Sequence, residues 1–442
     1  MKRDSEPVRA KASTGLGAPP SMPRHDMSRA GAALKGDLST SASKDALLSV
    51  DSSTPRAAHI KRAPSTSTAP THHRDTPSAS PSDGTEDTLS RLAAVVAEAG
   101  VESNAGDGGL LDAIERDLSR IESALAALAQ EAESHQGAAA HLLVSGGKRI
   151  RPTCVLLAAA LGGAAPRREA AEAKEQANRV HAFALAAELV HQATLLHDDV
   201  LDLGTTRRGK PCARLVYGNA ASIYGGDWLL VRALTTVLDA GDNAVLRNLL
   251  GTIETMVDAE VHQLKTKGTF RTTLADYERI ALGKTAALFR WALEAGAVAG
   301  GLDDAARQAL GRVGDSLGLA FQMVDDILDV VGDAAVTGKK QAGDLREGKL
   351  AYPLVKALSE QVIKAQDIAS IAETLASGDE QQGLGALAQL QARCCELGII
   401  DRCRAEVRAL TERALMDLKQ VPASPARTLL AEIITVSAGR EA

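Results

Sequence analysis

The chain has 442 residues, enough for one large domain or two ordinary ones, and its formal net charge of −6 gives no reason to expect a nucleic-acid partner. Its five cysteines are odd in number and lack paired metal-binding spacing, so we expect reduced thiols in a reducing, cytoplasmic setting. No uncharged apolar run reaches the roughly 18 residues of a membrane-spanning helix, which argues against a transmembrane segment.

The composition changes sharply near residue 90. Nine of the 15 prolines precede this point, and the first aromatic residue of the chain is Phe183. Without large apolar side chains such a segment cannot offset the entropy lost on ordering. We therefore predict a disordered low-complexity extension over residues 1–105 and a folded domain over 106–442. An organelle transit peptide is the alternative, but 10 acidic residues accompany 12 basic ones in residues 1–90.

A helical pattern begins near residue 105 and continues to the end of the chain. Leu111, Ile114, Leu118, Ile121 and Leu125 recur at steps of three and four, which is typical of an amphipathic helix. Further Ala- and Leu-rich helices are predicted over 181–200, 221–239, 244–265, 276–299, 304–332, 351–376, 381–397 and 402–419. No segment alternates with period two for long enough to build a sheet. The sequence therefore predicts an all-α fold, a single large helical bundle.

Two acidic clusters stand within these apolar helices. They are Asp198, Asp199 and Asp202 in "DDVLD" and Asp325, Asp326 and Asp329 in "DDILD". Residues four apart share a helix face, and the first cluster comes just before a loop, where the helix dipole disfavours anions. Carboxylates without histidine or thiolate partners favour a hard cation such as Mg²⁺. A solvated helix end would explain one such cluster, but it explains two near-identical clusters poorly.

Basic residues flank both clusters. They are Lys148, Arg149 and Arg151 in "SGGKRIRP", Arg207, Arg208 and Lys210 after the first cluster, Lys284 in "LGKTAALF", and Lys339, Lys340 and Lys349 after the second. Each group alone is an ordinary solvated face. Beside metal-binding carboxylates they indicate contacts to phosphate oxygens, which arginine can bind in pairs.

Together these motifs resemble those of the trans-polyprenyl diphosphate synthases, which condense isopentenyl diphosphate with an allylic diphosphate. The resemblance covers residues 106–440 and includes "GGKRIRP", "RRGKP", "GKTA", "FQMVDDILD" and "DLREGK". It implies the helical isoprenoid-synthase fold, Mg²⁺ as cofactor and assembly as a homodimer.

The resemblance also implies a role for each matching residue. The expected direct Mg²⁺ ligands are Asp198, Asp202 and Asp325, with Asp199, Asp326 and Asp329 in support. The expected isopentenyl diphosphate site consists of Lys148, Arg151, His191 and Arg208. The expected contacts to the allylic diphosphate are Arg207, Lys284, Lys349 and Lys339, with Lys340 as the alternative to Lys339. Thr285 and Gln322 are expected near the reacting carbon and, with Lys284, are the catalytic candidates.

A long-chain product is a further implication of the resemblance. In this family a bulky aromatic residue four or five positions before the first aspartate stops chain growth early, and Thr194 and Ala193 occupy those positions here. We expect the growing chain to pass Val190 and Ala187 along one helix face, with Leu246 and Leu249 at the floor of its tunnel. The predicted product has heptaprenyl to nonaprenyl length and serves as a quinone side chain.

Three other functions remain open at this point. A short-chain farnesyl or geranylgeranyl diphosphate synthase would differ only in product length. A non-catalytic subunit of a heteromeric synthase is expected to lose an acidic cluster or its basic partners, and this chain keeps both. A class I terpene cyclase has no second diphosphate to bind, so "GGKRIRP" argues against it.

The extension is predicted to be dispensable for catalysis. It contains no aromatic residue, little apolar periodicity and none of the candidate site residues. A shortened protein that starts near residue 95 should keep its fold and turnover, as measured by circular dichroism and product formation. Loss of folded, active protein on this truncation would show that the extension belongs to the domain.

Overall fold

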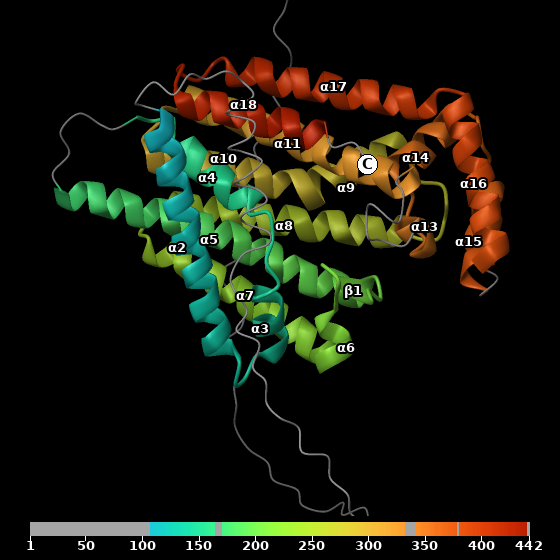
Figure 1. Cartoon of the computed structure of the whole chain (residues 1–442), viewed down its shortest axis with the longest axis horizontal. Helices are drawn as coiled ribbons and strands as arrows, with labels where there is room; N and C mark the ends of the chain where they lie inside the picture. Colours follow the sequence, from blue (N-terminus) through green and yellow to red (C-terminus); the bar gives the residue numbers. More distant parts are fainter. Residues whose placement is uncertain (1–106, 164–169, 332–341, 378–379, 440–442) are drawn as a thin grey trace, which may run out of the picture. The chain divides into compact units, whose positions relative to one another are not determined.

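Helices joined by short loops make up almost all of the described structure (Figure 1). A computed structural model describes residues 107–163, 170–331, 342–377 and 380–439, all of which fall in a compact unit covering residues 77–442. The predicted extension over residues 1–105, together with Lys339 and Lys340, lies outside the described residues.

The elements in chain order are α2 (Asp107–Ala132), α3 (Gly137–Leu143), α4 (Ile150–Ala160), α5 (Ala170–Leu201), β1 (Thr206–Arg207), β2 (Lys210–Pro211), α6 (Ala213–Tyr217), α7 (Asn219–Asp239), α8 (Asn243–Thr266), α9 (Leu274–Ala281), the π-helical turn η1 (Leu282–Ala286), α10 (Ala287–Gly300), α11 (Asp304–Val331), α13 (Gly343–Arg346), α14 (Tyr352–Ser359), α15 (Ala365–Ala376), α16 (Glu380–Glu396), α17 (Ile399–Leu418) and α18 (Pro425–Ala438). The two strands form one antiparallel pair. The predicted all-α fold is confirmed, and no helix in the described residues meets the length and apolarity needed to cross a membrane.

Two of the predicted helices differ from the observed ones. The run 351–376 is two helices, α14 and α15, because Gln361 takes a left-handed conformation with φ 58° and ends the first of them. The run 276–299 contains the π turn η1 between α9 and α10. Helices α3, α4, α6, α13 and α18 were not predicted as helices, since the first four are short and α18 follows Pro422 and begins at Pro425.

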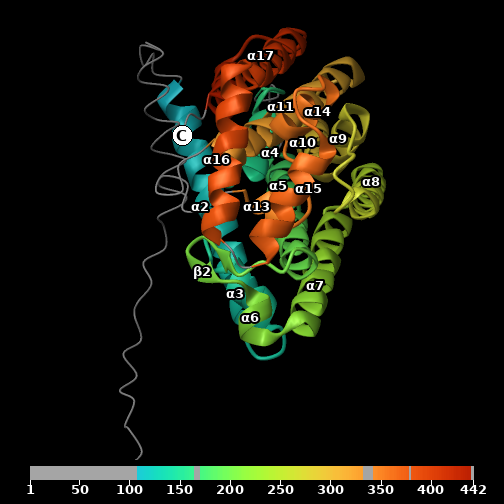
Figure 2. The same ribbon diagram turned by 90° about the vertical axis from the view of Figure 1, so that its right-hand side faces the viewer.

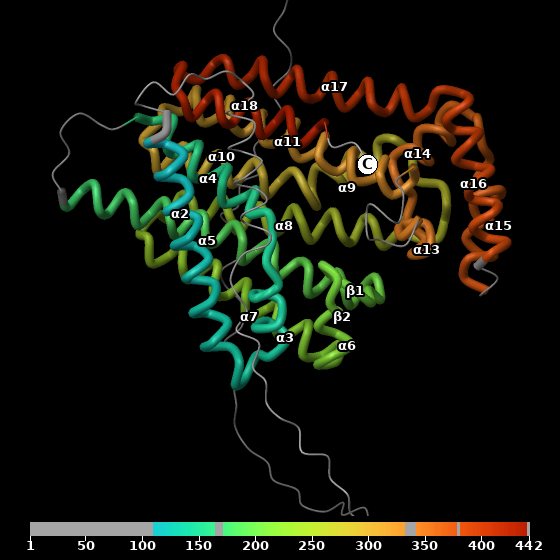
Figure 3. Tube along the Cα trace, viewed as in Figure 1, coloured from blue at the N-terminus to red at the C-terminus, as the bar shows by residue number. Residues whose placement is uncertain are grey.

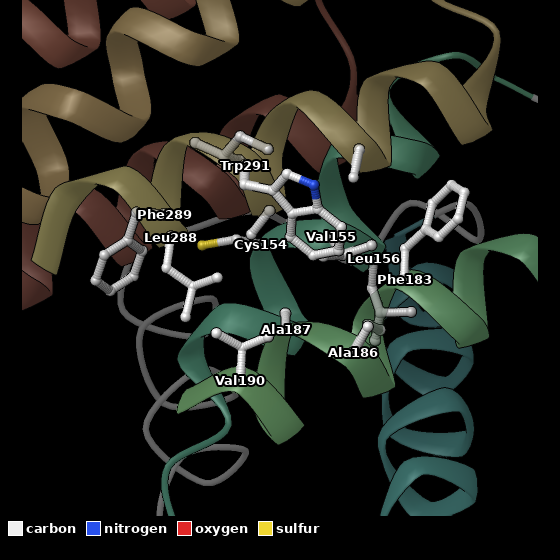
Figure 4. Packing of buried hydrophobic residues seen from close by; sticks show 14 of the residues in the cluster. Cys154, Val155, Leu156, Phe183, Ala186, Ala187, Val190, Leu288, Phe289 and Trp291 are labelled. Carbon is white, nitrogen blue, oxygen red and sulfur yellow. The ribbon is translucent and has the colours of Figure 1, made fainter. Parts of the chain in front are cut away.

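Two clusters of buried apolar side chains hold the helices together. Figure 4 shows part of the first, in which Cys154, Val155 and Leu156 of α4 lie between side chains of α5 and α10. The second cluster joins the C-terminal half of α11 to α14, α15, α16 and α17. Helix α11 contributes to both clusters, from Leu310 in the first to Ile327 in the second. Burial of this apolar surface fixes the position of the helix that carries the second acidic motif.

The two acidic motifs lie near the C-terminal ends of α5 and α11, on one side of the bundle, and α8 ends on the same side. In the trace of Figure 3, α13 and α14 lie at the same side as the C-terminal ends of α8 and α11. A backbone hydrogen bond from the Gly268 amide to the Gly348 carbonyl, 2.8 Å long, ties the loop after α8 to the loop after α13. Segments far apart in sequence therefore meet beside the acidic motifs.

Candidate active site

The first acidic motif faces lysines from other parts of the chain. The Lys284 ammonium lies 3.6 Å from an Asp198 oxygen and 2.6 Å from Glu260 of α8. Lys349 pairs with one oxygen of Asp202, and Lys267 lies 3.2 Å from the other. Asp199 points elsewhere: it is buried and accepts hydrogen bonds from Nε and a terminal nitrogen of Arg207, the latter at 2.8 Å. The motif thus has two carboxylates beside lysines and one that anchors an arginine.

The second acidic motif divides in a similar way. Asp326 is buried and accepts hydrogen bonds from the Gln322 amide at 2.8 Å and from the Tyr352 backbone N–H at 2.9 Å. Asp329 accepts the backbone N–H of Gly343 at 3.0 Å, at the start of α13. Burial lowers the pKa of the Arg151 guanidinium, and the negative charges of Glu188 and Asp325 act against this lowering. Asp325 is half-buried, whereas Asp326 is buried.

Burial and the neighbouring charges shift the pKa values of Asp198 and Asp202. Burial raises the pKa of Asp198, and the neighbouring carboxylates of Glu260 and Asp202 add to the rise, against the lowering effect of Lys284. Burial would also raise the pKa of Asp202, but Lys349, Lys284 and Lys267 overcome it and lower that pKa. At Asp198 the lysines only partly compensate the negative charge, and a further cation would stabilise its ionised form.

The donor atoms fit a hard divalent ion that is also bound by a substrate. Among the described residues, no three His, Cys, Asp or Glu side chains gather into a group that could hold a metal ion on its own. Mg²⁺ seldom needs such a cage, since it usually binds one or two carboxylates together with phosphate oxygens and water. Asp198, Asp202 and Asp325 supply carboxylate oxygens of this kind, so the residues present fit Mg²⁺.

The π turn η1 presents Lys284 and Thr285 to the site. A β-carbon at Gly283 would lie 2.5 Å from Cβ of Ala259, so only glycine lets η1 approach α8 this closely. The extra residue of a π turn rotates the following side chains, and such turns are frequent at functional sites. Lys284 reaches Gln263 of α8 at 3.1 Å, and the Thr285 hydroxyl donates to the Gln322 side chain at 2.8 Å.

A second, arginine-rich group forms around the glycine pair of "GGKRIRP". A β-carbon at Gly147, where φ is 152°, would lie 2.9 Å from the guanidinium groups of both Arg149 and Arg208. Arg149 is buried and pairs with Glu122 of α2 and Glu188 of α5, each at 2.5 Å. Arg208 donates to the carbonyl oxygen of Gly146. Arg149 and Arg208 both have positive φ, the kind of backbone strain that is common at functional sites.

His191 and Arg151 belong to the same basic group. Burial and then the charges of Arg151, Arg208, Arg207 and Arg149 lower the pKa of His191 well below its usual range, so the imidazole is neutral at pH 7. The Arg151 guanidinium lies 4.6 Å from the centre of the Phe289 ring, a cation–π contact. A neutral imidazole and several guanidinium groups in one place can bind an anion with several oxygens.

The structure therefore brings together most of the predicted site residues. The lysine-lined group includes Asp198, Asp202, Lys284 and Lys349, and Arg207 pairs with Asp199 of the same acidic motif. The arginine-rich group includes Arg151, His191 and Arg208. Thr285 and Gln322 join η1 to Asp326. Lys148 is exposed on the loop between α3 and α4. The roles assigned to these residues stay predictions.

Several residues at the site were not identified from the sequence. Glu188 is the one charged residue in the apolar run "AFALAAELVHQATLL", and this isolation was a usable sign that it has a buried partner. Glu122, Glu260 and Gln263 lie on helix surfaces and Lys267 directly follows α8, and nothing in their spacing distinguishes them. Tyr352 acts through its backbone N–H, which no sequence pattern can indicate.

Comparison with known proteins agrees with this geometry. The sequence model of the polyprenyl synthetase family matches residues 133–384. An all-trans-nonaprenyl-diphosphate synthase of Rhodobacter capsulatus is 35% identical over 303 residues, which is 68% of this chain and 87% of that protein. Component 2 of the heptaprenyl diphosphate synthase of Geobacillus stearothermophilus is 33% identical, over 72% of this chain and 93% of that protein.

Solved structures give the same result. A decaprenyl diphosphate synthase from Rhodobacter capsulatus superposes with a TM-score of 0.64 at 32% identity, covering 80% of this chain and 100% of that one. A polyprenyl synthase from Caulobacter crescentus, complexed with calcium and isoprenyl diphosphate, superposes with a TM-score of 0.65 at 31% identity, covering 82% of this chain and 99% of that one. With its family match, its close relatives and its paired acidic motifs, this chain belongs to the polyprenyl synthetase family and is a prenyltransferase.

Proposed function

We propose that the protein condenses isopentenyl diphosphate with an allylic diphosphate to build a long all-trans polyprenyl diphosphate, for use as a quinone side chain. The observation that carries this proposal is the presence of two separate cation-lined groups, one beside the aspartates and one around "GGKRIRP". Two diphosphate substrates need two such sites. A terpene cyclase would need only the first.

The arginine-rich group is suited to isopentenyl diphosphate. Arg151, Arg208 and exposed Lys148 can bind its phosphate oxygens, with neutral His191 as a further hydrogen-bond donor. Glu188 and Glu122 pair with Arg149 and so reduce the repulsion among the guanidinium groups. Before the substrate binds, these two carboxylates compensate part of the positive charge, and the group remains cationic.

The lysine-lined group is suited to the allylic diphosphate. As the allylic C–O bond breaks, negative charge grows on the departing diphosphate, and Lys284, Lys349 and Arg207 can stabilise that charge from fixed positions. Thr285 and Gln322 place their polar atoms beside the developing allylic cation. The alkene of isopentenyl diphosphate then attacks the cation, and a proton leaves the adjacent carbon. The released diphosphate can accept this proton, so no protein base is required.

Mg²⁺ is the cofactor that these residues fit. Asp198 and Asp202 on one helix and Asp325 on the other would hold it, and it would withdraw charge from the leaving diphosphate. The Caulobacter crescentus relative was solved with calcium and isoprenyl diphosphate, which supports the binding of a divalent ion.

Both acidic motifs should be required for turnover. Asp198→Ala and Asp325→Ala are each expected to lower turnover by orders of magnitude, because several kcal/mol of transition-state stabilisation are typical of a metal ligand. Steady-state kinetics with Mg²⁺ measures this, and circular dichroism should show unchanged helix content. Asp304→Ala, at the exposed start of α11, is the matched control and should remain active. Normal turnover in either variant would refute the site assignment.

Product length is proposed to depend on the inner face of α5. Ala187, Val190 and Ala193 are fully buried, and Thr194 is half-buried, one turn before Asp198. Figure 4 shows Ala187 and Val190 pointing into the packed region between α4, α5 and α10. At about 1.5 Å of rise per residue, Ala187 is roughly 16 Å along the helix from Asp198. The side chains of Ala187 and Ala193 are small, so they offer little obstruction to a chain that grows along this face away from the acidic motif.

The position of Leu246 and Leu249 is compatible with a floor for this path. Leu249 of α8 is fully buried and Leu246 packs against the same apolar cluster as Ala187. The relatives that make nonaprenyl and decaprenyl diphosphates support a product longer than geranylgeranyl diphosphate. A short-chain product is the alternative that the next experiment tests.

Thr194→Phe should shorten the product sharply while condensation continues. Thr194 shares a helix face with Asp198, so an aromatic ring there would close the path one turn from the reacting carbon. Ala193→Tyr should act in the same direction, although its fully buried position makes overpacking a cost. Chromatography of radiolabelled products measures chain length, with Thr428→Phe, exposed on α18, as the matched control. Wild-type protein that releases only farnesyl or geranylgeranyl diphosphate would refute the long-chain proposal.

Homodimer formation is proposed to use α7 and α8. Tyr224, Val231 and Leu238 of α7 are exposed by 53–66% and stand seven residues apart, which keeps them on nearly one helix face. Leu250, Val257 and Leu264 repeat the same spacing on α8, with exposures of 44–56%. Figure 2 shows these two helices along one outer edge of the bundle. Such heptad stripes are typical of helix packing, and a second copy of the chain presents the same apolar stripes.

Val231→Asp and Val257→Asp should each weaken the dimer, because a buried unpaired carboxylate is costly. Light scattering after size exclusion should give about twice the 46.0 kDa chain mass for the wild type and a lower average mass for the variants. Met416→Asp, at an exposed position on α17, is the control that should leave the mass unchanged. A monomeric wild type would refute the homodimer and favour a heteromeric enzyme, as the component 2 relative would allow.

A further inference from the structure

Lys267 lies immediately after α8, outside every motif on which the family resemblance is based. Its ammonium is 3.2 Å from Oδ1 of Asp202 and 3.4 Å from the carbonyl oxygen of Leu201, the last residue of α5. The side chain is 25% exposed, so it is neither locked in the core nor free in solvent. A cation at this place also faces the negative end of the α5 dipole.

The loop that carries Lys267 is held against the loop that carries Lys349. The Gly268 amide donates to the Gly348 carbonyl at 2.8 Å, and both glycines have positive φ, 75° and 78°. A β-carbon at Gly348 would lie 3.2 Å from the Gly268 nitrogen, a tight contact, and the positive φ of both residues also favours glycine. The two lysines next to these glycines therefore approach opposite oxygens of Asp202.

One carboxylate needs only one ammonium for its charge, and Lys349 already pairs with Asp202. An ammonium has three N–H donors, and the described contacts of Lys267 use two of them. Helix α8 also holds Lys284 through Glu260 and Gln263. The same helix thus positions two lysines beside the first acidic motif, one through other side chains and one directly.

We propose that Lys267 binds a diphosphate oxygen of the allylic substrate beside Lys349, an inference that rests on the proposed function of this site. The Lys267 ammonium holds the diphosphate in the ground state and stabilises the greater negative charge that it carries as a leaving group. Lys267 then acts on the allylic diphosphate and not on isopentenyl diphosphate, because its contacts all lie at the end of α5 and none is with the arginine-rich group.

The test compares Lys267→Met and Lys267→Arg with Lys265→Met in the full-length protein. Lys265 is an exposed lysine on the last turn of the same helix, so it controls for loss of one positive charge. Titration calorimetry measures binding of inorganic pyrophosphate in the presence of Mg²⁺, and steady-state kinetics gives KM for each substrate. We expect Lys267→Met to weaken pyrophosphate binding and raise KM for the allylic diphosphate by about tenfold or more. KM for isopentenyl diphosphate should not change, and Lys267→Arg should recover most of the lost affinity.

Equal pyrophosphate affinity in Lys267→Met and Lys265→Met would overturn the proposal. So would a variant that loses thermal stability but keeps pyrophosphate affinity, since Lys267 would then only cap α5. Failure of the proposed function is a separate result: a wild-type protein without prenyl transfer activity would refute that function. The pyrophosphate titration would still decide whether Lys267 binds a diphosphate.

Discussion

The structure depends on one electrostatic constraint. Like charges are buried beside one another, so opposite charges from elsewhere in the chain must lie next to them. Asp198 and Asp202 stand at the C-terminal end of α5, where burial, mutual repulsion and the helix dipole all disfavour carboxylates. Lys284, Lys349 and Lys267 offset these effects, and they come from three separate segments. The ends of α8, η1 and the loop after α13 must therefore meet at the end of α5, and the apolar clusters along α11 hold them there.

The arginine-rich group follows the same rule with the signs reversed. Arg149 uses Glu188 and Glu122 as partners, and these carboxylates come from α5 and α2. Because Glu188 lies three residues before His191, α5 carries both the negative charge that compensates the arginines and the imidazole whose pKa burial and the arginines lower. Helix α5 thus connects the two groups, with the arginine-rich one about two turns before the first acidic motif. Two substrates bound at these groups would meet along this one helix.

Much of the arrangement was predictable from the sequence, and what was missed has a physical explanation. Apolar periodicity identified most of the long helices, because each buries a continuous face. It could not identify η1, since a single π turn is too short a stretch to show a periodicity of its own. Motif residues identified the ends of α5 and α11. Their partners on α8 and directly after it, Glu260 and Lys267, could not be found, because periodicity gives the face of a residue and not the helix opposite to it.

Each acidic motif begins with two adjacent aspartates, although only one of the two carboxylates faces the site. Adjacent helical residues point about 100° apart, so both members of a pair cannot face the same group. Asp198 faces the lysines, while Asp199 turns into the bundle and holds Arg207. Asp325 is half-buried, while Asp326 is buried and holds Gln322 and the Tyr352 backbone. The inner aspartate of each pair therefore fixes a neighbouring segment of the chain, which makes the position of the outer aspartate depend on the packing of the helix that carries both.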